Sequence, residues 1–348
     1  MSKVGVRQVV DPVHLGEGPH WEENNQSLLF VDIMSCELHR YFPASGRHQI
    51  LHINDCGTGK SVGFVVPLEG DPNLLVVGLG RSLAVVEWSP NDVDDKTVDP
   101  KVVLQTVDEG NPTNRFNDGK CDPCGRLWAG TMGYETVPGQ PDLHKGSLFS
   151  LDSKLSISQC LQKISISNGL AWTHDRKTFY YIDSLEYSVD AFDYNETTGE
   201  IEGQLNIVQA VPGSGRVRLT TFQGNRRKVL DYKSSGLAKD IPDGMCIDVD
   251  GNLWVANFYG KKVICIDPRA GKIIQTIEMP AQNMTSVCWG GPNYDILYAT
   301  SSRTGVSPDD PNAKYGGATF AITGLGTKGQ KPSHFRVDLQ LLRTKYNK

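Results

Sequence analysis

Oxygen-bearing side chains recur at one position of a repeated sequence unit. They are Glu17, Asp118, Asn168, Asp243 and Thr285, and each except the last is followed by glycine. Carboxylates that face one another raise each other's pKa, and burying them is costly unless a cation compensates their charge. Ca²⁺ accepts carboxylate, carboxamide and water oxygens at flexible geometry, and Mg²⁺ or Mn²⁺ could use the same donors. The repeated position therefore predicts a site for one divalent cation.

The same dipeptides also have a simpler interpretation. Asp-Gly and Asn-Gly are common in turns, and a single one would indicate nothing more than a turn. The repeated phase of the whole set favours the cation site. None of the eight histidines shows metal-ligand spacing, which argues against a structural zinc site.

Three further polar residues lie close to Asp118 in the sequence. Arg115, Asn117 and Lys120 would place a guanidinium, a carboxamide and an ammonium group around the same position. Such a cluster suits the recognition of several hydroxyls or of an anionic group. A salt-bridged loop is the alternative interpretation of this stretch.

The repeated unit indicates the elements that must position these side chains. In three copies a tryptophan follows the first residue by four positions, and a polar residue at the end of a second strand follows it by fifteen. These copies are 17–32, 168–183 and 285–300. Two variant copies begin at Asp118 and Asp243, and a weaker sixth begins at Ser61. Four short strands per unit of about 40 to 50 residues are typical of a β-propeller blade.

We therefore predict an all-β chain: a six-bladed β-propeller with four-stranded antiparallel blades around a central, metal-containing channel. The first strand of each blade runs beside the channel, so the repeated position converges on one axis. Residues 1–348 would form a single domain, and the 36 glycines and 19 prolines suit its many turns. Residues 209–224 read as a surface loop inserted between the fourth and fifth blades, and a short C-terminal tail begins at about 333.

Composition and charge exclude several classes of protein. The formal net charge is −5 and no long Lys/Arg run is present, so nucleic acid is not an expected partner. No apolar run approaches the ~18 residues that cross a bilayer, and the first residues do not form a signal peptide. We expect no membrane partner, a cytoplasmic location and eight free thiols. Cys121 and Cys124 form one isolated CxxC, which we interpret as a hairpin turn.

Several segments resemble one enzyme family. They are 15–23, 114–120, 129–132, 166–169, 181–184, 187–193 and 241–248. Together they resemble the regucalcin (senescence marker protein), gluconolactonase and luciferin-regenerating-enzyme family over about residues 8–330. The resemblance implies a six-bladed propeller, one divalent metal ion and a metal-dependent lactonase that hydrolyses sugar lactones as its small-molecule substrates.

The resemblance also implies roles for individual residues. Glu17, Asn168 and Asp243 would bind the metal, and Asp243 would also act as the catalytic acid/base. Arg115, Asn117 and Glu135 would contact the lactone, and Glu135 is implied by the resemblance alone. Ca²⁺ is the first expectation for the ion, with Zn²⁺, Mn²⁺ and Mg²⁺ as alternatives.

Three other functions stay open at this point. One is a calcium-binding regulatory protein with little catalytic role, although no EF-hand loop is present. A second is a hydrolase of the luciferin-regenerating type, and a third is a propeller scaffold that binds proteins. Loops that cap the channel set specificity, so the sequence does not choose the substrate.

Overall fold

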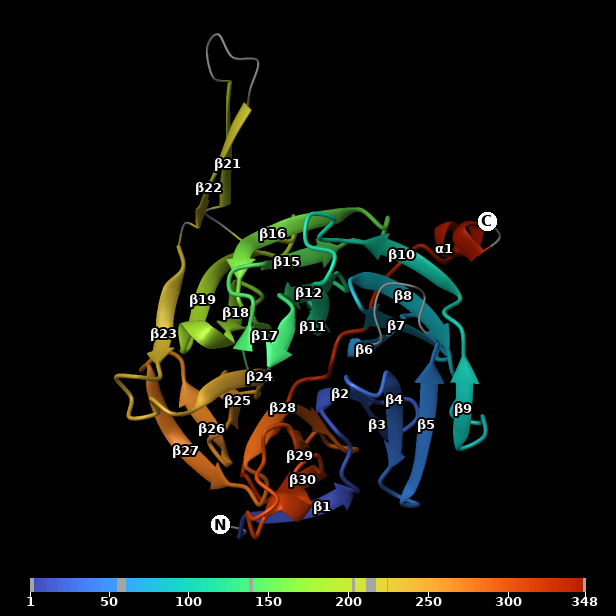
Figure 1. Cartoon of the computed structure of the whole chain (residues 1–348), viewed down its shortest axis with the longest axis vertical. Coiled ribbons are helices and arrows are strands. Elements are labelled where there is room, and N and C mark those ends of the chain that lie inside the picture. Colours follow the sequence, from blue (N-terminus) through green and yellow to red (C-terminus); the bar gives the residue numbers. More distant parts are fainter. Residues whose placement is uncertain are drawn as a thin grey trace.

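Six small antiparallel sheets stand in a ring around a central channel (Figure 1). The computed structural model describes residues 3–54, 61–137, 140–201, 204–210, 217–223 and 225–346. The predicted six-bladed propeller is confirmed, and the first strand of every blade begins where the repeat analysis places it. No helix in these ranges is long and apolar enough to cross a membrane.

The first three blades follow one another along the chain. The first contains β2 (Gly16–Glu22), β3 (Ser27–Asp32), β4 (Glu37–Phe42), β5 (Arg47–Ile53) and, parallel to β5, β9 (Asp95–Val98). The second contains β6 (Val62–Pro67), β7 (Leu74–Leu79), β8 (Ser82–Glu87) and β10 (Val102–Thr106). The third contains β11 (Arg115–Cys121), β12 (Leu127–Met132), β15 (Gly146–Leu151) and β16 (Ile157–Ile164). A small hairpin of β13 (Glu135–Val137) and β14 (Gln140–Pro141) leaves the third blade between β12 and β15.

The remaining blades complete the ring. The fourth contains β17 (Ser167–Trp172), β18 (Thr178–Asp183), β19 (Ser188–Asn195) and β23 (Arg227–Asp231), with η1 (Ser184–Glu186) after β18 and β20 (Glu200–Ile201) beside β19. The fifth contains β24 (Ile241–Ile247), β25 (Leu253–Phe258), β26 (Lys262–Asp267) and β27 (Lys272–Glu278). The sixth joins β28 (Asn283–Gly290), β29 (Ile296–Ser302) and β30 (Thr319–Thr323) to the N-terminal strand β1 (Gly5–Val10), with η2 (Ala313–Tyr315) before β30.

All six first strands carry an irregularity at the repeated position. The register between first and second strand shifts there in β2, β6, β11, β17, β24 and β28. Such bulges re-aim side chains. The adjacent glycine is required by close packing: a Cβ at Gly169 would lie 2.8 Å from the carbonyl oxygen of Asp243 in the next blade. The Asp-Gly and Asn-Gly dipeptides are therefore strand residues beside the channel and not simple turns.

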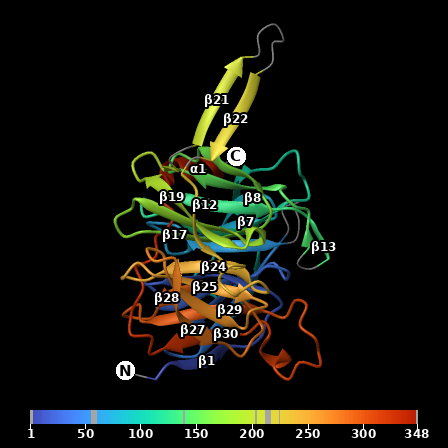
Figure 2. The same cartoon turned by 90° about the vertical axis from the view of Figure 1, so that its left-hand side faces the viewer.

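The insertion differs from the predicted surface loop in its secondary structure and in its position relative to the blades. β21 (Gln204–Ala210) pairs in register with β22 (Val217–Gln223), and this ribbon projects away from the propeller (Figure 2). The strand that follows, β23, returns to pair with β19 as the outer strand of the fourth blade. The insertion therefore lies inside the fourth blade and not between the fourth and fifth. Residues 211–216 and 224 of the expected loop lie outside the described residues.

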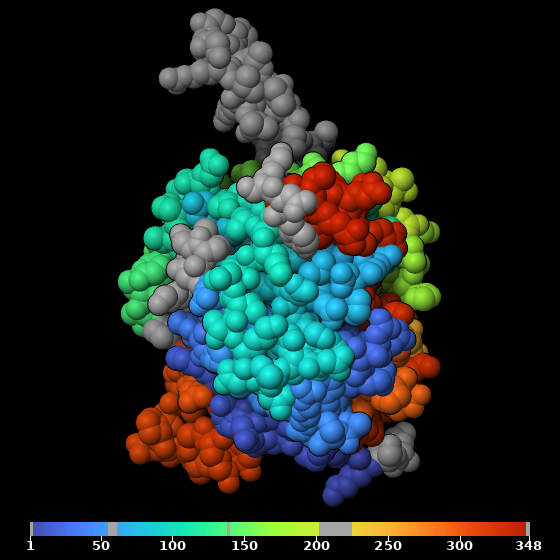
Figure 3. Space-filling view, turned by 90° about the vertical axis from the view of Figure 1, so that its right-hand side faces the viewer, coloured from blue at the N-terminus to red at the C-terminus, as the bar shows by residue number. Residues whose placement is uncertain are grey.

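The C-terminal segment crosses one end of the channel. Its backbone hydrogen bonds reach Val249, Tyr294, Glu69, Gly125 and Ser153, which belong to five different strand connections. Lys331 also pairs with Glu23 of the first blade. The segment ends in α1 (Leu339–Tyr346), whose Leu342 packs with Leu104 on the outside of the second blade (Figure 3). We call this the closed end, and the end where the first strands begin is the mouth.

Candidate functional site

The mouth holds a cavity of about 90 Å³ that contains all the predicted site residues. They are Glu17 on β2, Asn168 on β17, Asp243 on β24, Arg115 and Asn117 on β11, and Glu135 on β13. Asp118 and Thr285 share the repeated position but do not line this cavity. Thr285 donates to Gly16 O at 2.5 Å, which joins the last blade to the first.

Glu17 and Asp243 are buried carboxyl groups that interact with each other. Burial, followed by the charge of Asp118, raises the pKa of Glu17 to about 8, although the Gly18 N–H and Arg115 oppose this shift. Burial also raises the pKa of Asp243 well above its usual range, and the charges of Glu17 and Asp118 add to it. Desolvation is thus the largest cause in both groups, and proximity to like charge is the second.

One carboxylate oxygen in this pair has no hydrogen-bond partner among the residues that the structure describes. Asp243 Oδ1 is buried and accepts no hydrogen bond from the described residues. Within those residues, no three His, Cys, Asp or Glu side chains stand close enough to hold a metal ion by themselves. A cation here would need the carboxamide oxygen of Asn168 and water besides the two carboxylates. That all-oxygen set fits Ca²⁺ or another hard divalent cation.

Asn168 is held in one orientation by its neighbours. Its Nδ2 donates to Ser184 Oγ at 2.8 Å, and its Oδ1 accepts from Asn117 Nδ2 at 3.2 Å. These bonds assign the oxygen of the amide to the side of Asn117. Ser184 is a site residue that the sequence reasoning missed. Its signal was weak, because it follows β18 and lies outside the repeated first-strand position.

Arg115 and Asn117 form a connected polar wall. Arg115 Nη1 donates to Asn117 Oδ1 at 2.8 Å and to Phe116 O at 3.1 Å. Asn117 Nδ2 donates in turn to Ser167 O at 2.9 Å. Burial lowers the pKa of Arg115, while the charges of Glu135, Glu17 and Asp243 act in the opposite direction. A partly buried guanidinium therefore faces the carboxylates of the cavity.

Lys120 does not join this wall, contrary to the expected cluster. Its ammonium donates to Leu170 O at 3.0 Å and to Met245 O at 2.6 Å. It lines a second cavity of about 110 Å³ at the closed end. Because a strand rises about 3.3 Å per residue, Lys120 lies about 7 Å further along the channel than Asp118. Lys120 links the first strands of three blades and is not placed to contact a ligand at the mouth.

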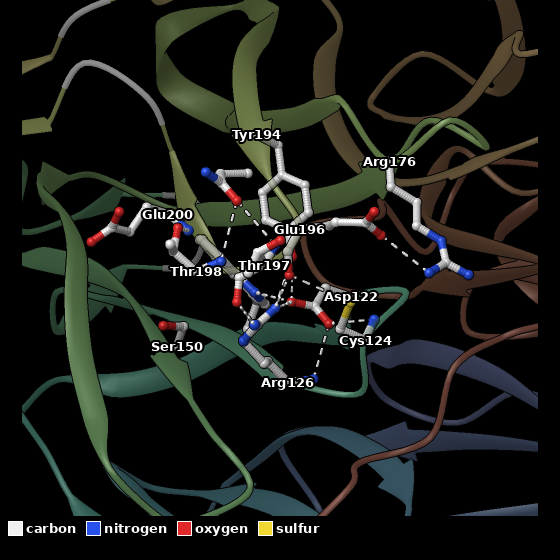
Figure 4. A network of polar contacts seen from close by, with 12 residues as sticks. Asp122, Cys124, Arg126, Ser150, Arg176, Tyr194, Glu196, Thr197, Thr198 and Glu200 are labelled. Atoms are coloured by element: carbon white, nitrogen blue, oxygen red, sulfur yellow. Dashed lines mark hydrogen bonds and ion pairs between the residues drawn. The ribbon is translucent and has the colours of Figure 1, made fainter.

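Asp122 is a buried carboxylate with a structural role, and Figure 4 shows the polar contacts around it. Its oxygens accept from Tyr194 OH at 2.6 Å, Trp128 Nε1 at 3.2 Å and the backbone of Cys124 at 2.8 Å. Arg126 adds an ion pair. The CxxC is the turn expected from the sequence, and Cys121, Cys124, Cys160, Cys246, Cys265 and Cys288 are free thiols. Asp122 is satisfied by protein donors, whereas Asp243 is not.

Comparisons with known proteins agree with the propeller fold. A family model described as the SMP-30/Gluconolactonase/LRE-like region matches residues 15–303. Regucalcin of Oryctolagus cuniculus is 39% identical over 338 residues, which cover 95% of this chain and 98% of the relative. Regucalcin of Gallus gallus is 39% identical over 340 residues, covering 96% and 99%.

Two solved structures have the same propeller. A luciferin-regenerating enzyme has a TM-score of 0.81 and 31% identity, covering 97% of this chain and 100% of that chain. A regucalcin from Agrobacterium tumefaciens, described as a calcium-binding protein, has a TM-score of 0.76 over 96% of this chain and 98% of that chain. Its identity of 22% shows the shared fold alone. On the family match and the long alignments with regucalcins, the chain belongs to the SMP-30/gluconolactonase/LRE-like family.

Proposed function

We propose that this protein is a divalent-cation-dependent hydrolase of lactones, with Ca²⁺ as the first candidate ion. The observation that carries the proposal is the buried pair of Glu17 and Asp243 in the mouth cavity. Among the described residues Asp243 Oδ1 has no donor, and the partly buried guanidinium of Arg115 lines the same cavity. Membership of the SMP-30/gluconolactonase/LRE-like family and the similarity to a luciferin-regenerating enzyme both support a small-molecule substrate.

Glu17, Asn168 and Asp243 would hold the cation by their side-chain oxygens. When bound, the ion supplies a Lewis acid for the lactone carbonyl and charge for the developing oxyanion. Besides the cation, Arg115 would provide a second positive group in the cavity. Glu135 lies near Arg115. The buried walls exclude bulk water, which strengthens each of these electrostatic interactions.

Asp243 is the residue best placed to move protons. In the proposed reaction a water oxygen forms a bond to the carbonyl carbon while one water proton passes to the carboxylate of Asp243. The bond between the carbonyl carbon and the ring oxygen then breaks, and Asp243 returns the proton to that oxygen. The product is the open-chain hydroxy acid, and the carboxylate is restored.

The experiment measures lactone hydrolysis and bound metal together. The purified protein should hydrolyse members of a lactone panel with Ca²⁺, and a chelator should abolish the rate reversibly. Arg115→Ala should retain the metal but raise KM, because it removes a group that positions the substrate. Metal binding without turnover on any lactone would contradict the proposal and favour a cation-binding role. Full activity of metal-free Asp243→Ala would contradict the assignment of the site.

A further inference from the structure

One wall of the mouth cavity is a chain of hydrogen bonds that all run in the same direction. Arg115 Nη1 donates to Asn117 Oδ1 at 2.8 Å, and Asn117 Nδ2 donates to Asn168 Oδ1 at 3.2 Å. Asn168 Nδ2 then donates to Ser184 Oγ at 2.8 Å. All four residues line the mouth cavity, and Asn117, Asn168 and Ser184 are buried.

The direction of this chain is fixed by its first members. A guanidinium has donors and no acceptor, so Asn117 must turn its oxygen toward Arg115. The carbonyl oxygen of Ser167 can only accept, and it receives Asn117 Nδ2 at 2.9 Å, which requires the same orientation. Turning the amide of Asn168 around would bring its N–H groups against those of Asn117. Asn168 therefore turns its oxygen toward Asn117 and its nitrogen toward Ser184.

Ser184 is the last member of the chain, and its hydroxyl oxygen is the acceptor there. A serine hydroxyl also carries one hydrogen of its own, which Ser184 can still donate. Within the described ranges of the chain, this hydrogen has no acceptor. The residue is 1% exposed and lines the mouth cavity. Because a buried hydroxyl hydrogen is costly to leave unpaired, its acceptor is expected inside that cavity.

Ser301 occupies the equivalent repeat position in the sixth blade and differs in this respect. Ser184 follows the copy at 168–183, and Ser301 follows the copy at 285–300. Ser301 is fully buried, and its Oγ donates to Ala318 O at 2.6 Å. The hydroxyl hydrogen of Ser301 is therefore satisfied within the protein, away from the residues that line the mouth cavity. That of Ser184 is available to a ligand in the mouth.

We infer that Ser184 donates a hydrogen bond to a hydroxyl group of the lactone ring and so selects hydroxylated lactones over unsubstituted ones. The inference rests on the proposed function and goes beyond it by adding a substrate-binding residue. A hydroxylated ring supplies the acceptor that Ser184 lacks. An unsubstituted ring leaves the hydroxyl hydrogen of Ser184 unpaired in a buried cavity, and this penalty is the basis of the selection.

The experiment compares two lactones on the full chain at saturating Ca²⁺. We measure kcat/KM for D-glucono-δ-lactone, which carries ring hydroxyls, and for δ-valerolactone, which carries none. Ser184→Ala should lower the preference for the first lactone about fivefold, as expected for one hydrogen bond. The variant also removes the acceptor of Asn168 Nδ2, but that loss affects both lactones alike and cancels in the ratio. An unchanged ratio would overturn the inference and leave the lactonase proposal standing.

Ser301→Ala is the matched control for this variant. It removes a buried serine hydroxyl at the equivalent repeat position, outside the mouth cavity. It should lower the unfolding temperature, because a buried hydrogen bond is lost, and leave the preference between the two lactones unchanged. The same fall of the ratio in both variants would overturn the assignment of Ser184.

A binding measurement separates the inference from turnover. D-glucono-δ-lactam keeps the hydroxylated ring and the carbonyl but resists hydrolysis. Calorimetry at saturating Ca²⁺ should show that the lactam binds Ser184→Ala about fivefold more weakly than the unmodified protein, and Ser301→Ala with unchanged affinity. Equal affinity for Ser184→Ala, or no binding to the unmodified protein, would overturn the inference. Weaker binding to Ser184→Ala without hydrolysis of any lactone would contradict only the proposed function.

Discussion

The mouth and the closed end of the channel are formed by the same six first strands, yet charge is compensated in opposite ways. At the mouth, Asp243 Oδ1 has no donor in the part of the chain that the structure describes, and Glu17 interacts with a like charge. At the closed end, Lys120 is bonded to two carbonyl oxygens and the C-terminal segment covers the strand connections. This difference indicates where a ligand is needed. The carboxyl groups of Glu17 and Asp243 at the mouth lack a fully compensating partner among the described residues, and the mouth is the end where we propose that a substrate binds.

The largest expected effect comes from removing the unbalanced charge. Asp243→Asn should lower kcat/KM by about three orders of magnitude, since it removes both a metal ligand and the acid/base group. In the presence of chelator the same variant should unfold at a higher temperature than the unmodified protein, because a buried charge repulsion is gone. Steady-state kinetics and thermal unfolding with chelator test both expectations.

Asp122→Asn is the matched control for a buried carboxylate. It should lower stability, because Tyr194, Trp128 and Arg126 lose their acceptor. It should leave the affinity for Ca²⁺ unchanged. If both variants changed stability in the same direction, the contrast between the two carboxylates would be wrong.

The C-terminal segment should matter for stability and not for chemistry. Phe335 is fully buried in the core that joins the second and third blades. Phe335→Ala should cost about 3–5 kcal/mol of unfolding free energy. Urea unfolding measures this loss, and kcat/KM per folded molecule should not change. A fully stable variant would show that the segment only rests on the closed end.

Lys120 tests whether the two ends are mechanically coupled. Lys120→Met leaves the carbonyl oxygens of Leu170 and Met245 without their ammonium donor, which should cost about 2 kcal/mol of stability. These carbonyls lie two residues after Asn168 and Asp243, so the affinity for Ca²⁺ should weaken by up to about tenfold, within ~1.4 kcal/mol. Calorimetric titration with Ca²⁺ checks this, and unchanged affinity would show that the two ends are independent.

The smallest expected effect is a pH dependence at the closed end. Burial, then the charges of His334 and Lys120, lowers the pKa of His20 well below its usual 6.5. The unfolded chain therefore binds a proton that the folded chain does not, so stability is complete above about pH 6.5 and falls as the pH decreases. The slope for one proton is about 1.4 kcal/mol per pH unit.

His20→Gln should reduce the slope by about one proton, and a residual slope should remain because burial also lowers the pKa of His48 and of His334. Unfolding free energies between pH 5 and 7.5, measured with saturating Ca²⁺ so that the mouth stays constant, provide the comparison. An identical slope in the variant would assign the acid sensitivity to other groups.

The sequence was most informative where the repeat has a fixed phase. Because Glu17, Asn168 and Asp243 occupy equivalent positions, their meeting at one axis follows from the propeller alone. Lys120 was misplaced because neighbours in sequence need not share one end of a channel. Glu135 has no repeat phase, since it lies on a hairpin between two strands of its blade, and only the family resemblance indicated it.

The outer strand β23 explains why the insertion was misplaced. Its sequence begins with Arg227 and Lys228, and an exposed outer strand needs no buried alternation. Without that pattern, the segment after the ribbon looked like part of a connection between blades.

The closure of the sixth blade by β1 has a consequence for the order of assembly. β1 pairs with β30, so the ring cannot close until the ribosome has released the strand that ends at Thr323. Glu17 is synthesised with the first blade and Asp243 with the fifth, so the nascent chain carries separate halves of the site. Any cation-dependent gain in folding must therefore come late, after translation has delivered the final blade.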